Sequence, residues 1–327
     1  MRRRTFLSLL TASAAAPFST VGAQQAARTK VVGLVSAFSE AEMKPLRAVF
    51  TEKLRSLGWQ EGDNLELDFR LTGGKPEDMA VAAGALSERH PDVIVAQGSP
   101  ALMGVRKNAG IVPVIFLLVA DPVGQGLIQS LSRPGGNLTG FTNFEFSVGS
   151  KWVELIREIS PATRRIVLIA NPGNSASTPF SDQIESASRS IGLDIHTVDV
   201  RNASEIETAI RGAAGSPPAA LITLPDFLPV VNRDLIVSLT NQLGIPSIHP
   251  FRTFPVNGGL MSYGLDFPDL YRQVAIYVDR VLRGEKPANL PVQAPNKFEL
   301  VVNLKTAKML GIEVPQPLLT GADELIE

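Results

Sequence analysis

The chain has 327 residues, and its 31 basic side chains nearly balance 32 acidic ones, which gives a formal net charge of -1. This length exceeds the usual size of one domain, and a hydrophobic content of 44% is enough for two cores. The balanced charge predicts no binding to nucleic acid and no polybasic attachment to a membrane. The absence of cysteine excludes a disulfide framework, a thiol nucleophile and a lipid-bearing N-terminal cysteine.

The first 23 residues have the pattern of an export signal. Arginines at positions 2–4 precede a short apolar stretch, and the small residues at 21–23 offer a cleavage site. The sequence RRTFL at 3–7 also fits the core of a twin-arginine signal. We therefore expect cleavage near Ala23 and a periplasmic protein that meets the membrane only through a partner. The alternative is a cytoplasmic protein with a basic N-terminus.

Short β-branched runs then alternate with segments of helical periodicity, which is typical of βαβ units and parallel sheets. In the first half we expect strands at 30–35, 65–71, 93–96 and 114–118, and helices at 41–57, 77–89 and 101–108. The second half repeats this order, with strands at 165–170, 194–200, 219–224 and near 248, and helices at 180–191, 203–214 and 231–243. The repeat predicts two similar α/β lobes with parallel sheets, joined by a hinge.

A Gly/Pro-rich stretch at 132–143 separates the two halves, and a second crossing is expected near 258–264. We therefore assign residues 29–141 plus about 262–290 to lobe one, and residues 142–261 plus about 291–327 to lobe two.

Ligands of open parallel sheets bind beyond the carboxyl ends of the strands, where helix N-termini offer free N–H groups. Two such sheets across a hinge predict one cleft between the lobes. The residues expected to line this cleft are Ser36, Phe38, Ser99, Asp121, Asn143, Asn171, Asp226, Phe251, Arg252 and Tyr263.

Several of these residues also have a purely structural interpretation. Ser99 either caps the helix that follows or contacts a polar ligand group, and both roles are compatible. Asp121 is either a cap or a partner for a ligand amine or hydroxyl, and Asp226 occupies the equivalent of the Ser99 position in lobe two. Asn171 is either a turn residue or an amide that holds the ligand.

Arg252 is the cation placed to meet an anionic ligand, unless it is simply solvated. The aromatic residues Phe38, Phe251 and Tyr263 form either stacking walls of the cleft or ordinary core.

Sequence patterns for catalysis are missing. The three histidines, His90, His196 and His249, are scattered and show no metal-binding spacing. No glycine-rich phosphate loop or dinucleotide motif is present. We therefore expect no metal, no cofactor and no catalytic site, so the sequence predicts binding rather than turnover.

Five stretches carry a resemblance to a known family: LGWQEG at 57–62, DPVG at 121–124, RPGGNLTG at 133–140, GLMSYG at 259–264 and KFELVVNLKTA at 297–307. With them, the chain resembles the ABC transporter substrate-binding protein family, whose best-understood members bind tryptophan or tyrosine. The resemblance implies the type I periplasmic binding protein fold, with two Rossmann-like lobes joined by three crossovers.

The resemblance also implies a permease and its ATPase as partners, a monomeric protein, and a site lined by Ser99, Asp121, Asn171 and Asp226. Capture of a small organic ligand by hinge closure follows, and we favour an amino acid or related carboxylate. The alternatives are a ligand-sensing module for a membrane receptor, and a hydrolase that uses Asp121 or Asp226.

Overall fold

The computed structural model describes residues 28–73, 76–108, 110–119, 121–142, 146–174, 176–214, 218–294 and 296–327. The expected export signal and Asn143 lie outside the described residues. Within these ranges, no helix combines the length and the apolar character that crossing a bilayer requires.

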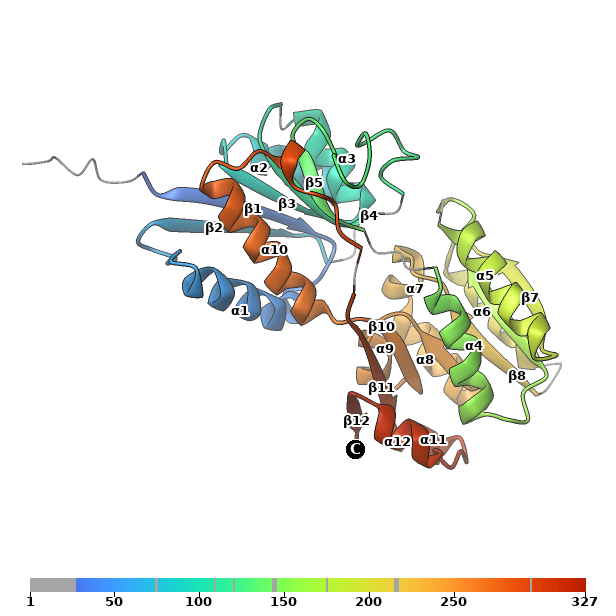
Figure 1. Cartoon of the computed structure of the whole chain (residues 1–327). Coiled ribbons are helices and arrows are strands. Elements are labelled where there is room, and N and C mark those ends of the chain that lie inside the picture. Colours follow the sequence, from blue (N-terminus) through green and yellow to red (C-terminus); the bar gives the residue numbers. More distant parts are fainter. Residues whose placement is uncertain are drawn as a thin grey trace, which may run out of the picture.

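The first lobe is built on a five-stranded sheet in which every neighbouring pair is parallel (Figure 1). Its strand order is β2-β1-β3-β4-β5. The strands are β1 (Lys30–Ser36), β2 (Leu65–Leu71), β3 (Val93–Gln97), β4 (Val114–Val119) and β5 (Leu138–Thr142). The helices of this lobe are α1 (Glu40–Ser56), α2 (Pro76–Ser87), α3 (Ser99–Asn108) and α10 (Phe267–Leu282), followed by the short 3-10 helix η1 (Pro287–Asn289).

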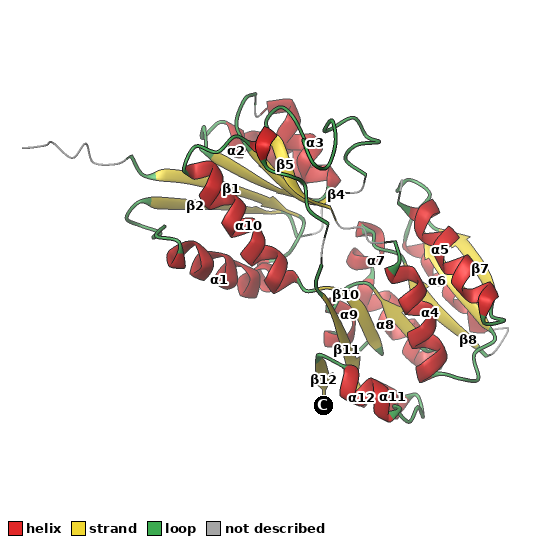
Figure 2. Cartoon of the chain, viewed as in Figure 1, coloured by secondary structure: helices red, strands yellow, loops and turns green. Residues whose placement is uncertain are grey.

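Helices cover both faces of this sheet, so its strands are apolar on both sides. Helices α1 and α10 share one face, where Phe50 and Tyr271 are fully buried. Helices α2 and α3 cover the other face. Figure 2 shows α10 lying beside α1, although the two helices are far apart in the sequence.

The second lobe has a seven-stranded sheet of order β12-β11-β10-β9-β8-β6-β7. Its strands are β6 (Arg165–Ala170), β7 (Asp194–Asp199), β8 (Ala219–Thr223), β9 (Ser247–His249), β10 (Met261–Leu265), β11 (Phe298–Asn303) and β12 (Glu324–Ile326). Its helices are α4 (Val148–Ile159), α5 (Ser177–Ser190), α6 (Ala203–Ala214), α7 (Phe227–Val231), α8 (Arg233–Gln242), α9 (Thr253–Val256), α11 (Leu304–Met309) and α12 (Gln316–Gly321). Strand β11 pairs antiparallel with β10 and parallel with β12.

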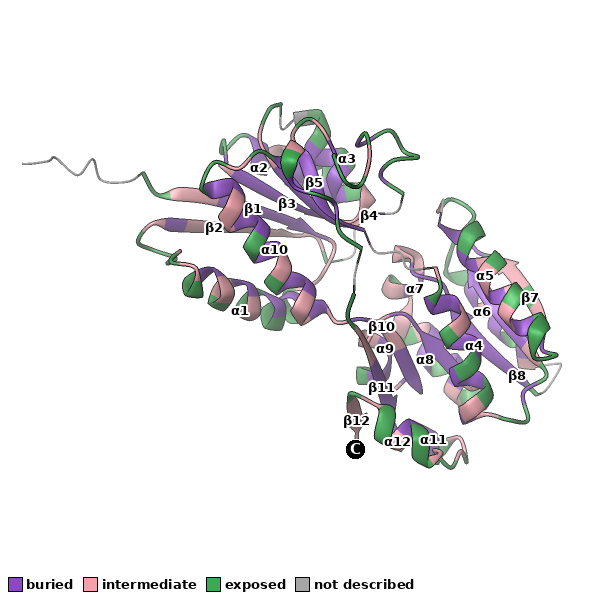
Figure 3. Ribbon diagram, viewed as in Figure 1, coloured by how far each residue is buried: buried purple, intermediate pink, exposed green. Residues whose placement is uncertain are grey.

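The orders β2-β1-β3-β4-β5 and β7-β6-β8-β9-β10 are the same topology used twice. The prediction of two similar α/β lobes with mostly parallel sheets is therefore confirmed. In each lobe the buried strands form a layer between helices whose outer faces are exposed (Figure 3).

The crossings between the lobes differ in detail from the expected boundaries. Residues 262–265, assigned above to lobe one, belong to β10, which pairs with β9 and β11 of the second sheet. The chain crosses only after this strand ends. Val292 and Gln293 still bond to lobe one, through Leu131 O at 2.7 Å and Gly140 O at 3.0 Å.

Candidate functional site

The two lobes contact each other beyond the carboxyl ends of their strands. Phe38 follows β1, Phe267 begins α10 and Phe251 follows β9 in lobe two. The Phe267 ring lies 5.6 Å from that of Phe38 and 5.9 Å from that of Phe251, measured between centroids. The carboxyl edges of both sheets, meaning the edges formed by these strand ends, thus lie on the side where the lobes meet.

An apolar pocket lies at the carboxyl edge of lobe two. Its walls come from α4, α5, the loops after β8 and β9, and the hinge ends of β10 and β11. The residues that line it are Val148, Trp152, Phe180, Pro225, Pro250, Phe251, Gly264, Leu265 and Phe298.

The aromatic wall of this pocket is fixed by its contacts. The rings of Trp152 and Phe180 stack with centroids 5.4 Å apart, and Trp152 Nε1 donates to Tyr263 O at 2.7 Å. Tyr263 itself stacks on Phe298, with ring centroids 5.9 Å apart. The walls enclose only about 20 Å³, little more than one water molecule needs, so a bulky ligand group can enter only where the walls or the lobes move apart.

Gly264 allows the floor of the pocket to form. A Cβ atom at this position would lie 1.7 Å from Pro250 O. Only glycine therefore lets the end of β10 approach the loop after β9 this closely.

A polar cluster adjoins the pocket beside Pro225. Asp226 is the N-cap of α7, and its Oδ1 accepts from Leu228 N at 2.8 Å and from Asn171 Nδ2 at 3.1 Å. Its Oδ2 accepts from Asn174 Nδ2 at 2.8 Å. Asn171 and Asp226 are thus brought together, and Asp226 is held by donors of its own lobe. Asn174 was not predicted to join this cluster, because its only sequence signal is a polar residue in a turn.

At the carboxyl edge of lobe one, Ser36 is fully buried and does not face a ligand directly. Its hydroxyl donates to Gln97 Oε1 at 2.9 Å and accepts from Phe38 N at 3.0 Å. Tyr271 OH donates to the same Gln97 oxygen at 2.5 Å. Neither Gln97 nor Tyr271 was predicted to lie at this edge, although a polar residue at the end of the apolar strand VIVAQ was a usable signal for Gln97.

The segments after β3 and β4 carry two more predicted residues. Helix α3 begins at Ser99 itself, which is half-buried and follows Gly98. Asp121 is exposed, has a φ of 35°, and accepts from Gly124 N at 2.8 Å through Oδ1. Leu118 has a φ of 57° where the register of β4 shifts against β5. Positive φ at residues other than glycine is uncommon, and such bulges aim neighbouring side chains.

Neither Arg252 nor His249 lines the pocket, although they flank its residues Pro250 and Phe251 in the sequence. Arg252 was expected to meet an anionic ligand. Its guanidinium group instead forms an ion pair with Glu324 of β12 at 2.6 Å. His249 is fully buried, stacks on Phe254 and contacts Thr223 Oγ1 and Ser247 Oγ. Burial lowers the pKa of His249 to about 3, so its imidazole is neutral at physiological pH.

Burial also raises the pKa of the Tyr263 phenol, which therefore remains protonated at neutral pH. Across the described ranges, no group of three or more histidine, aspartate or glutamate side chains is arranged to hold a metal ion.

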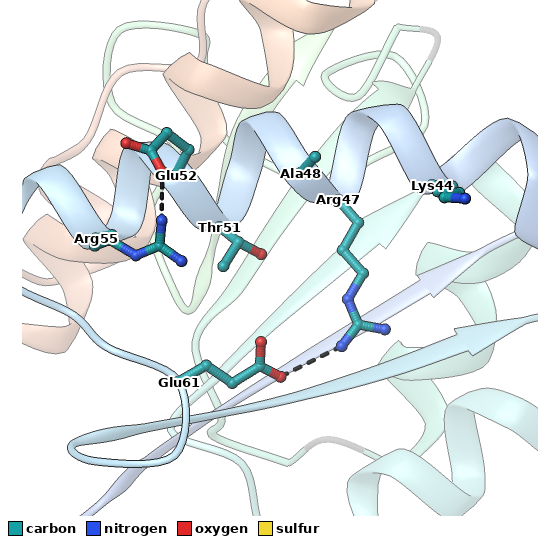
Figure 4. Close-up of a pocket in the computed structure, with 7 residues that line it drawn as sticks. All are labelled: Lys44, Arg47, Ala48, Thr51, Glu52, Arg55 and Glu61. Carbon is teal, nitrogen blue, oxygen red and sulfur yellow. Dashed lines mark hydrogen bonds and ion pairs between the residues drawn. The ribbon is translucent and has the colours of Figure 1, made fainter.

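A wider and more open hollow lies on the outer side of α1 (Figure 4). It is lined by Lys44, Arg47, Ala48, Thr51, Glu52, Arg55 and Glu61. Arg47 pairs with Glu61 across the hollow at 3.3 Å, and Arg55 pairs with Glu52 of the same helix at 2.6 Å. Four of the five charged side chains that line this hollow are paired with one another, all but Lys44. Because the hollow also lies away from the strand ends, the pocket of lobe two is the better candidate site.

Comparisons with known proteins agree with this two-lobed arrangement. A curated relative from Clostridioides difficile (strain R20291), described as a tyrosine-binding protein, is 24% identical over 287 residues, or 88% of this chain and 82% of the relative. A solved structure of a conserved domain protein from Vibrio cholerae is 26% identical with a TM-score of 0.79, covering 91% of this chain and 99% of that one. A structure from Streptococcus pneumonia in complex with L-Trp is 24% identical with a TM-score of 0.81, covering 91% and 100%.

The family model described as ABC transporter substrate binding protein matches residues 32–326, which is nearly the whole described chain. The resemblance noted from the five sequence stretches is thereby confirmed. This chain belongs to the ABC transporter substrate binding protein family, and it is the substrate-binding component of such a transporter.

Proposed function

We propose that the protein captures an amino acid, or a related small carboxylate, that carries an aromatic or bulky apolar group. The observation that carries this proposal is the pocket of lobe two. Its lining includes four aromatic side chains, those of Trp152, Phe180, Phe251 and Phe298. Burying an aromatic side chain against such walls contributes about 1.5–3 kcal/mol of binding free energy. The tyrosine-binding relative and the neighbour in complex with L-Trp are consistent with this ligand class.

Substrate-binding proteins of ABC importers typically work outside the cytoplasm. For this chain we propose export to the periplasm as a monomer, closure of the two lobes over the ligand, and delivery to a permease and its ATPase. The ligand leaves unchanged, because nothing in the pocket walls supplies a nucleophile or an acid–base pair.

Isothermal titration of the purified protein with L-tryptophan, L-tyrosine and L-phenylalanine tests the ligand class, with glycine and myo-inositol as comparisons. We expect at least one aromatic amino acid to bind at least tenfold tighter than glycine. Mass spectrometry of the released ligand should recover the compound intact.

A matched pair of variants links binding to the pocket. Phe180→Leu removes part of the stacked wall and should weaken aromatic binding by about tenfold. Phe69→Leu makes the same chemical change on β2, far from the pocket, and should leave affinity unchanged. Equal affinity for glycine and the aromatic amino acids, or equal effects of the two variants, would contradict the proposal.

A further inference from the structure

Gln97 occupies the last position of β3, at the carboxyl edge of lobe one. Its side chain is only 5% exposed. Two hydroxyl groups from distant parts of the chain, Ser36 Oγ and Tyr271 OH, both contact its amide oxygen. This arrangement fixes which end of the amide faces inward.

The distances identify the inward end as the oxygen. The contact of 2.5 Å with Tyr271 OH suits an O–H···O hydrogen bond and is too short for N–H···O. Tyr271 is fully buried, so its phenolic proton needs an acceptor, and Gln97 Oε1 provides one. Ser36 Oγ already accepts from Phe38 N, which leaves its own proton to donate to Oε1.

The amide nitrogen of Gln97 therefore points away from this buried pair. It has no acceptor among the described residues. It is also not one of the fully buried polar atoms that lack a partner in those residues. Nε2 consequently keeps contact with solvent, and its two N–H groups are held in a fixed direction at the carboxyl edge.

The surroundings of this donor favour a negatively charged acceptor. Helix α3 has ten residues and begins two positions after Gln97, so its free N–H groups and positive dipole end lie at the same edge of the sheet, although α3 packs on the face opposite to the one that Gln97 shares with Tyr271. A carboxylate oxygen is the acceptor that benefits from both features.

We propose that the Gln97 amide is a specificity-determining group that donates a hydrogen bond to the ligand carboxylate. This inference rests on the proposed function and adds to it the orientation of the ligand between the two lobes. The ligand carboxylate binds lobe one, and its aromatic group fills the pocket of lobe two. The ligand thereby bridges the two lobes, which is what closure requires.

The test compares L-tryptophan with tryptamine, which lacks only the carboxylate, by isothermal titration. Gln97→Met keeps the length of the side chain and removes the donor. It should weaken L-tryptophan binding by about tenfold or more and leave tryptamine within about twofold. Tyr271→Phe removes one hydroxyl that fixes the amide, and it should weaken L-tryptophan by about threefold with no effect on tryptamine. Gln242→Met, an exposed position of α8, is the matched control and should change neither.

Equal weakening of both ligands in Gln97→Met, or no weakening of either, would overturn the carboxylate contact and leave the proposed function intact. If wild-type protein binds no aromatic amino acid, the proposed function and this inference both fail. Circular dichroism reports whether each variant folds. If Gln97→Met does not fold, Tyr271→Phe decides the question, since a carboxylate-independent effect there also overturns the contact.

Discussion

Glu42, in the first turn of α1, forms an ion pair across the two lobes with Arg233, the first residue of α8, at 3.0 Å. The other Glu42 oxygen accepts from Ser39 N and Ser39 Oγ, which completes the capping box of α1. The two side chains of the pair are only 20% and 22% exposed, so water screens them partially. The start of α1 and the relative position of the lobes are therefore linked through one carboxylate.

Removing this ion pair should change how the lobes are distributed in solution. Arg233→Gln and Glu42→Gln each remove about 0.5–1 kcal/mol of interlobe interaction, and the double variant should add nothing further. Because the chain has no cysteine, spin labels can be placed at Val81→Cys and Met309→Cys alone. Double electron–electron resonance should show a broader or shifted distribution of the distance between the two spin labels in all three variants. An unchanged distribution, or effects that simply add, would show that the pair does not hold the lobes.

Glu299 should make stability fall as the pH rises from about 4.5 to 7. It pairs with Gly264 across β10 and β11, and its Oε1 is buried without a partner. Burial, opposed by nearby Arg252, raises its pKa from 4.5 to about 7. The stabilisation of the protonated form is thus complete below pH 4.5 and is lost as the pH rises through 7. Allowing for partial solvent screening, Glu299→Gln should stabilise the protein by about 1–2 kcal/mol at pH 8.5 and change little at pH 5.

Urea unfolding at several pH values measures this effect. The acidic groups Asp266, Asp323 and Glu324 also raise the pKa of Glu299. If Glu299→Gln stabilised the protein equally at pH 5 and pH 8.5, the raised pKa of Glu299 would be contradicted.

His249 should limit stability in acid. Its pKa is lowered from 6.5 to about 3 in the folded protein, so the unfolded chain binds the proton first as the pH falls. Stability is then complete above pH 6.5 and declines toward pH 3, by at most about 1.4 kcal/mol per pH unit. His249→Gln should lower stability at pH 7 by about 1–3 kcal/mol and flatten this decline. His196→Asn, on the exposed edge strand β7, is the control and should keep the wild-type decline.

Gly264→Ala should destabilise the protein and damage the pocket together. The added methyl group would meet Pro250 O, so β10 and the loop after β9 must separate. A loss of about 2 kcal/mol or more is expected by chemical denaturation, together with weaker ligand binding. Gly212→Ala, in the last turn of α6 with open space around it, should instead stabilise by up to about 0.5–1 kcal/mol. A Gly264→Ala protein with normal stability would show that the loop can move freely.

The sequence predicted those elements whose own residues determine them. Strands β1 and β6 are uninterrupted apolar runs between turn residues, and both were located to within about a residue. Strands β5 and β10 were missed as strands, because LTGFT and MSYGL contain glycine and resemble turns. They become strands only by pairing with β4 and β9, which is a property of the assembled sheet.

For the candidate site too, contacts between distant parts of the chain could not be predicted from the local sequence. The position of Asn171 and Asp226 at the carboxyl edge could be predicted because strand ends are recognisable in the sequence. Their role as ligand contacts stays a prediction. The hydrogen bonds of Gln97 could not be predicted even though its place at the strand end could, since they join it to Ser36 and to Tyr271, which lies 174 residues away in the sequence. Trp152 was missed for a related reason, because its stacking on Phe180 is a contact between two helices.

The position of α10 has a consequence for how the protein is made. This helix covers one face of the first sheet, yet it follows most of lobe two in the chain. While the polypeptide leaves the ribosome, the strands of lobe one emerge long before their covering helix, and an apolar surface around Phe50 stays uncovered. The nascent first lobe is therefore a natural substrate for holding chaperones, and any truncation before α10 should yield an aggregating fragment.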